Sequence, residues 1–221
     1  NFSLDIERNL KVKGFMANNN KNLEFLPVDV GENFPNLLAY SASRCCLRGL
    51  VNSNFKGLTS LQHLDLQHNK IDSIESKNFH DLKSLRFLKL SFNKINRISN
   101  DSFDSLVKLE ELHLENNQLQ FISFHIDSLI KLKIFDASEN KLVAFPNYFF
   151  KNNKKLVKIL LINNQLNSIP HKIFDEISYL NFIDFKGNTC IDGEFFEENF
   201  EIMKEKLKND CWILIKNAWK I

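Results

Sequence analysis

The sequence predicts a solenoid of the α/β class, in which short strands from successive repeats stack into a parallel sheet. Three observations predict it: a leucine that recurs at a nearly constant interval, a fixed apolar pattern after each leucine, and an asparagine at one place in almost every unit. The spacings between the leucines are 24, 24, 24, 23, 24 and 24 residues, a period typical of repeat proteins. The leucines are Leu37, Leu61, Leu85, Leu109, Leu132, Leu156 and Leu180.

Each unit follows the template LxxLxLxxNxLxxI. The segments from Leu61 to Ile71 and from Leu85 to Ile95 are near copies of one another. Apolar residues in the LxxLxL part alternate with polar ones, as in a short strand with one buried face. One such strand cannot bury its apolar side alone, so we expect the strands to stack side by side into a continuous core and a parallel sheet.

The asparagine column is expected to satisfy the backbone where the chain turns inward. A side-chain amide at this place can bond backbone groups of its own turn and of the next one. Cys45 occupies the place in the first full unit and is expected to be buried and free. Cys46 is left open, either as a free thiol or as the partner of a cysteine outside this chain. The column consists of Asn69, Asn93, Asn117, Asn140, Asn164 and Asn188.

Two further apolar columns fill the less regular half of each unit. We expect core packing from both and predict no cofactor pocket, with neighbouring rings offset or edge-on. The phenylalanine column accounts for part of the 21 phenylalanines of the chain. The first column is Leu50, Ile74, Ile98, Ile122, Phe145 and Ile169, and the second is Phe55, Phe79, Phe103, Phe150 and Phe174.

A stack of repeats needs a cap at each end. We predict an N-terminal cap with a degenerate first repeat at 1–36, repeats at 37–189, and a C-terminal cap at 190–221. The C-terminal cap carries an apolar helical pattern formed by Phe196, Phe200, Met203 and Leu207.

The C-terminal cap also carries two of the four cysteines, Cys190 and Cys211. Their pairing is predicted because a helix folded over the last coil brings its end to its start. A loop of about 20 residues closed in this way is worth about 3 kcal/mol. The apolar segment from Trp212 to Ile221 either completes the cap or forms a contact surface.

Composition and motifs exclude several classes of protein. The chain of 221 residues is 43% hydrophobic and 25% charged with a net charge of +2, the balance of an ordinary soluble protein. It has no apolar stretch long enough to cross a membrane. It has no glycine-rich phosphate loop and no nucleophile placed beside a base, so no enzyme is predicted. Lysines form no basic stripe, which disfavours nucleic acid. Without an initiator Met or a leader, the chain is expected to be a mature form or part of something longer.

With units near 24 residues and FxxL in the variable half, the chain resembles the extracellular leucine-rich repeat proteins. This group includes Toll-like receptor ectodomains and secreted animal proteins such as insect immune factors. Asn188-Thr-Cys190 through Cys211 resembles their cysteine-bounded cap, with two cysteines instead of four. The resemblance implies a curved right-handed solenoid with an irregular or short-helical convex side. It also implies a concave sheet that binds partners, usually proteins, in immunity or cell-surface signalling.

Two glycosylation sequons agree with a secretory route and an extracellular location. They begin at Asn1 and at Asn100. Asn100 lies in the variable half of its unit, so a glycan on it would leave the sheet surface open.

The solvent-facing strand positions are expected to form columns across the sheet, since neighbouring strands lie about 4.8 Å apart. Opposite charges at Asp65 and Lys89 predict a partly self-neutralised ladder. Large apolar side chains on such a face indicate a surface that something covers. The columns are Ser41, Asp65, Lys89, His113, Asp136, Leu160, Asp184 and Ala39, His63, Phe87, Glu111, Ile134, Lys158, Phe182.

From these columns we predict a partner-binding surface for an unidentified protein. Phe87, Phe92, Leu160 and Ile162 would be its anchors, and Ile134 and Phe182 would add apolar area. Glu110, Glu111 and Glu115 would select the partner by charge, with His113 among them. Glu111, His113 and Glu115 on one strand are interpreted as solvated, so no metal site is predicted.

Three alternatives stay open. The chain could be the ectodomain part of a membrane receptor, a structural or protective solenoid, or an inhibitor of secreted enzymes. A homodimer could cover the exposed aromatic residues instead of a different partner.

Overall fold

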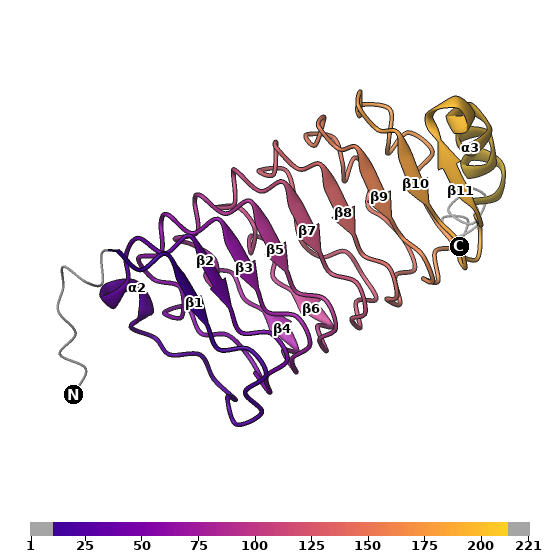
Figure 1. The fold of residues 1–221 in the computed structure, drawn as a ribbon. Coiled ribbons are helices and arrows are strands. Elements are labelled where there is room, and N and C mark those ends of the chain that lie inside the picture. Colours follow the sequence, from indigo (N-terminus) through magenta and orange to yellow (C-terminus); the bar gives the residue numbers. More distant parts are fainter. Residues whose placement is uncertain (1–10, 212–221) are drawn as a thin grey trace.

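The computed structural model describes residues 11–211 as an elongated stack of turns (Figure 1). Within this range, one side of the stack is a nine-stranded sheet in the order β1-β2-β3-β5-β7-β8-β9-β10-β11. The predicted parallel-sheet solenoid is therefore confirmed. The strands are β1 (Gly14–Met16), β2 (Ala39–Ser41), β3 (His63–Asp65), β5 (Phe87–Lys89), β7 (Glu111–His113), β8 (Ile134–Asp136), β9 (Lys158–Leu160), β10 (Phe182–Asp184) and β11 (Glu194–Phe196).

The strand register is the one that the repeat spacing predicts. Lys89 of β5 lies between Asp65 of β3 and His113 of β7, and Asp136 of β8 follows His113. All pairings from β1 to β10 are parallel. Because each strand has one buried residue between two outward ones, a constant repeat length aligns equivalent side chains across the sheet.

The asparagine column forms the hydrogen-bond ladder expected from its position. The Oδ1 atom of Asn93 accepts a bond from the Ile71 amide at 3.1 Å. Its Nδ2 group donates to the carbonyls of Leu66 at 3.0 Å and Leu90 at 2.9 Å. The other asparagines of the column repeat this arrangement. Cys45 is buried and free, as predicted, and its thiol donates to the Ala17 carbonyl at 3.1 Å.

The phenylalanine column is a buried aromatic spine. The ring centroids of Phe79 and Phe103 lie 6.3 Å apart with nearly parallel planes, which is an offset arrangement. The sequence pattern missed Phe124, which meets Phe103 edge-on at 5.4 Å. Phe124 fills the spine in the unit of 23 residues, where the shorter repeat moves the aromatic residue out of its regular place.

The side opposite the sheet consists mainly of turns. Its regular part is the two-stranded pair β4 (Ser73–Ile74) and β6 (Arg97–Ile98). Two short α-helices lie towards the ends of the stack, α2 (Val30–Asn33) and α3 (Phe200–Lys206). No helix in residues 11–211 has the length and apolar character that a membrane crossing requires.

The C-terminal end differs in part from the predicted helix. The prediction that Phe196 begins the helix was wrong, because this residue belongs to β11, which pairs antiparallel with β10. The strand forms there because Phe195 enters the core while Phe196 packs on Phe182, and it covers the edge of β10. A 3-10 turn (Glu197–Asn199), α3 and a π-helical turn (Leu207–Cys211) follow.

The cap is closed as predicted in its remaining features. Met203 and Leu207 are buried. Cys190 and Cys211 form a disulfide, with their Cα atoms 5.0 Å apart. The sequon at Asn1 and the segment from Trp212 to Ile221 lie outside the described residues.

Candidate functional site

The sheet face is the solvent-facing surface of β2–β10 together with the turns that follow the strands. Its large side chains gather in three places, which follow one another along the stack. The aromatic patch is His63, His68, Phe87 and Phe92. The acidic cluster is Glu111, His113, Glu115 and Asp136. The apolar patch is Ile134, Leu160, Ile162 and Phe182.

The turn after each strand has a backbone conformation that the sequence pattern did not reveal. The residue just before the column asparagine has a positive φ in every full unit. These residues are Arg44, His68, Phe92, Asn116, Glu139, Asn163 and Gly187. Phe92, at φ 55°, adopts a conformation that costs an ordinary L-residue about 1–2 kcal/mol. Phe87 and Phe92 therefore do not share one strand as predicted, since Phe92 lies in the left-handed turn beyond β5.

The aromatic patch is built from two stacked pairs. His63 and Phe87 have ring centroids 4.6 Å apart, and His68 and Phe92 have centroids 4.3 Å apart, both with interplanar angles of 12°. The Arg86 guanidinium lies 5.3 Å from the centre of the Phe87 ring. Phe92 remains 42% exposed, so this patch offers a flat aromatic surface.

Glu110, a predicted partner selector, is instead paired within the chain. Its Oε1 atom lies 2.6 Å from Arg86 Nε, and its Oε2 atom lies 2.7 Å from Lys133 Nζ. These three residues come from consecutive units and hold them together. The hydrogen bonds from Arg86 and then Lys133 lower the pKa of Glu110 to about 2. A partner would have to compete with two neighbouring cations for this carboxylate.

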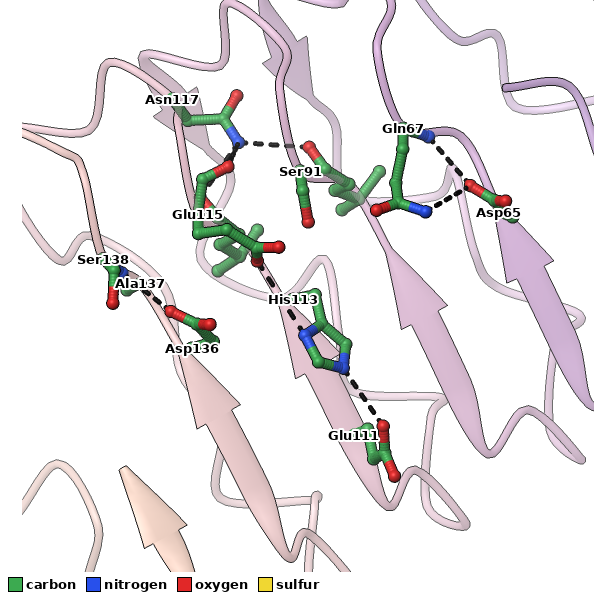
Figure 2. A network of polar contacts seen from close by, with 12 residues as sticks. Asp65, Gln67, Ser91, Glu111, His113, Glu115, Asn117, Asp136, Ala137 and Ser138 are labelled. Carbon is green, nitrogen blue, oxygen red and sulfur yellow. Dashed lines mark hydrogen bonds and ion pairs between the residues drawn. The ribbon is translucent and has the colours of Figure 1, made fainter. Parts of the chain in front are cut away.

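The acidic cluster surrounds His113 (Figure 2). Its Nε2 atom lies 3.1 Å from Glu111 Oε2, and its Nδ1 atom lies 3.8 Å from Glu115 Oε2. Asp136 joins from β8, the next strand. The sequence identified Glu111, His113 and Glu115 from a single strand and its turn, whereas the approach of Asp136 to Glu115 depends on the bend of the turn after β7.

Burial raises the pKa of Asp136, and the Glu115 charge adds to this effect. Bonds from Ser138 oppose it, including one from the Ser138 amide to Asp136 Oδ1 at 3.0 Å. This carboxylate is therefore held in place while its charge is poorly compensated.

The expected ladder between Asp65 and Lys89 was wrong for the described residues. Asp65 accepts bonds from the Gln67 amide at 3.0 Å and from Gln67 Nε2 at 3.1 Å (Figure 2). Ser41 Oγ lies 3.4 Å from its other oxygen. Local bonds to the turn therefore occupy Asp65, and Lys89 stays exposed on the sheet face.

The apolar patch covers the last three parallel strands of the sheet. Leu160 of β9 is in register with Asp136 and Asp184, and Phe182 of β10 is in register with Lys158. The Phe182 ring lies 5.0 Å from Phe196 and 5.3 Å from the Lys158 ammonium. All four members of the patch are half-buried, so a partner could still cover each of them.

Two family models match the chain. The model described as leucine rich repeat matches residues 43–95 and 65–119. The model described as BspA type leucine rich repeat region matches residues 123–219. No curated protein matches the sequence.

A solved structure is also similar, that of a TLR13–ssRNA13 complex, with 28% sequence identity and a TM-score of 0.75. The similarity covers 88% of this chain and 27% of the TLR13 chain, so this chain spans about a quarter of that protein. The repeat models, the strand register and the asparagine ladder agree with this likeness. The chain is a leucine-rich repeat protein that resembles Toll-like receptor ectodomains.

Proposed function

We propose that this chain is an extracellular, non-enzymatic recognition module that binds a protein partner through the sheet face. The observation that carries the proposal is the alignment of the aromatic patch, the acidic cluster and the apolar patch on one continuous sheet. The likeness to a Toll-like receptor ectodomain supports a ligand-binding repeat module.

The apolar side chains on the sheet face contribute little to the core of the repeats, which is filled by the opposite faces of the strands. Covering a large apolar side chain fully is worth about 1.5–3 kcal/mol. Leu160, Ile162 and Phe182 are already half-buried, so each would contribute part of that amount. Together with Phe87 and Phe92, they form two separated groups of anchors with a polar segment between them.

The polar segment favours a protein over a nucleic acid as the partner. The solved neighbour is a complex with single-stranded RNA. In this chain, however, the middle of the sheet face carries Glu111, Glu115 and Asp136, which would repel phosphates. A partner with a basic residue flanked by apolar ones would fit the three patches in order.

An extracellular location is supported by the disulfide of the C-terminal cap, because such bonds persist in oxidising compartments. Asn100 is exposed in its sequon, as glycosylation would require. The share of the TLR13 chain that is covered, 27%, favours a second form of the same function, in which the chain is part of a longer receptor ectodomain. Immunity or cell-surface signalling would then be the setting.

The proposal is tested by affinity capture from the extracellular fluid of the source organism, followed by binding measurements with the purified partner. Leu160→Asp places a charge in the apolar patch. Phe92→Asn removes an exposed ring and keeps a residue that tolerates positive φ. Tyr148→Asn is the matched control, because Tyr148 is also aromatic, 65% exposed and at φ 63°, but lies in the turns away from the sheet.

We expect the two sheet-face variants to lose the partner while the control retains it. Equal capture by all variants, or loss in the Tyr148 variant alone, would contradict the proposal. Labelled single-stranded RNA serves as a further arm. Saturable RNA binding that Leu160→Asp abolishes, without capture of a protein, would replace the protein partner with a nucleic acid.

A further inference from the structure

The acidic cluster has the geometry of a metal site. His113 comes from β7, Glu115 from the turn after it and Asp136 from β8. One possible ligand atom from each of them lies within 4.8 Å of the other two. Two ligands of one zinc ion, with bonds of about 2.1 Å, can be at most about 4.2 Å apart. Small side-chain rotations would therefore bring all three ligands to one ion.

The hydrogen bond to Glu111 prepares His113 for this role. Glu111 Oε2 lies 3.1 Å from His113 Nε2, and an ionised carboxylate accepts but cannot donate. In a neutral imidazole the proton therefore sits on Nε2, and Nδ1 carries a free lone pair. Such a carboxylate bond to the outer nitrogen orients metal-binding histidines in proteins.

The lone pair of Nδ1 has no donor to face. The nearest carboxylate atom, Glu115 Oε2, lies 3.8 Å away, which is too far for a hydrogen bond. Two electron-rich atoms thus face one another across a gap, and a cation between them would replace repulsion with two bonds.

A second, independent observation also indicates a missing cation or donor. Ser91 is completely buried, and its Oγ atom has no hydrogen-bond partner. Figure 2 shows this side chain beside Glu115, and a 3.0 Å bond from the Phe92 amide to the Glu115 carbonyl holds the two turns together. Glu115 Oε2 is itself buried without a hydrogen-bond partner. Buried polar atoms are rarely left unsatisfied.

We propose that His113, Glu115 and Asp136 bind one Zn²⁺ ion on the sheet face, with Glu111 as the positioning residue of the histidine. An imidazole nitrogen combined with carboxylate oxygens suits Zn²⁺, whereas Ca²⁺ uses oxygen ligands alone. Two carboxylates would balance the charge of the ion. This site goes beyond the proposed function and does not depend on the partner.

The test is a calorimetric Zn²⁺ titration of the chain with Cys46→Ser, because the free Cys46 thiol could compete for the metal. We expect one ion per chain. His113→Ala and Asp136→Asn should abolish binding, and Glu111→Gln should weaken it about 10–100-fold. His125→Ala is the matched control, since His125 is exposed and outside the cluster. It should leave the affinity unchanged, and Ca²⁺ should bind less tightly.

Nitrogen NMR of the histidine rings provides a second measurement that does not need a variant. Zn²⁺ should shift the Nδ1 resonance of His113 and leave that of His125 in place. The proposal is overturned if no stoichiometric binding occurs, or if His113→Ala and Asp136→Asn bind as tightly as the parent. It is also overturned if both His113 nitrogens stay protonated when Zn²⁺ is added, because the gap would then be filled by an imidazolium proton.

Discussion

Replacing one column asparagine should weaken the whole stack, and Asn93→Ala is the variant for which the loss can be worked out. Asn93 accepts a bond from the buried Ile71 amide and donates to the carbonyls of Leu66, Leu90 and Ser91. After the substitution, Leu66 and Leu90 keep one donor each, from Asn69 and Asn117. The Ile71 amide loses its partner.

The magnitude follows from these bonds. An orphaned buried amide costs about 1–3 kcal/mol, and each lost hydrogen bond to a carbonyl costs about 0.5–1.5 kcal/mol net. Because the carbonyls of Leu66 and Leu90 remain partly satisfied, the three donated bonds should contribute near the lower end of that range. We therefore expect Asn93→Ala to lower the free energy of unfolding by about 3–5 kcal/mol.

The assay is urea unfolding followed by circular dichroism, with Asn96→Ala as the matched control. Asn96 belongs to the same unit but is exposed, so its replacement should change stability by less than about 0.5 kcal/mol. Asn93→Cys should fall between the two, because Cys45 fills the same place with a thiol donor. A loss below about 1 kcal/mol for Asn93→Ala would refute the view that this ladder stabilises the turns.

Three further outcomes are expected. Replacing Cys190 and Cys211 with Ala should lower the unfolding free energy by about 3 kcal/mol, measured by urea unfolding with and without reductant; equal stability of the two forms would contradict it. Glu110 has its pKa lowered from 4.5 to about 2, so its contribution is present above pH 4.5 and is lost as the pH falls towards 2. Glu110→Gln should flatten this acid-side decline, and an unchanged slope of stability against pH would count against the pairing. Asp136 has a raised pKa, so its ionisation opposes folding as the pH rises. Asp136→Asn should therefore be more stable than the parent at pH 7 in the presence of EDTA, and a lower melting temperature would disprove this.

The fold could be predicted because one period determines most of it. Once Leu61, Leu85 and Leu109 are aligned, the strand register follows, since every unit contributes the same number of residues to each turn. The buried asparagine bonds follow for the same reason. Phe124 was missed because the unit with one residue fewer breaks the period on which the prediction depended.

The ends of the stack were harder to predict from periodicity. Phe196 fits a helical spacing with Phe200 and Met203, yet it lies in β11. The open edge of β10 offers backbone hydrogen bonds to the next available segment, and this tertiary effect leaves no periodic pattern in the sequence.

The candidate site was only partly accessible from the sequence. The columns placed Phe87, His113, Leu160 and their neighbours on one surface. They could not show that Glu110 is neutralised by Arg86 and Lys133, because that depends on how long side chains bend across units. The left-handed turn at Phe92 was also hidden, since residues of many types occupy the equivalent positions.

The central claim is that the sheet face is the recognition surface. A structure of the chain bound to its captured partner tests it most directly. The account predicts that the partner covers Phe87, Phe92, Leu160 and Phe182 and places a basic group near Glu111. A partner seated instead on the turns around Tyr148 and Tyr179, with the sheet face left in solvent, would contradict it.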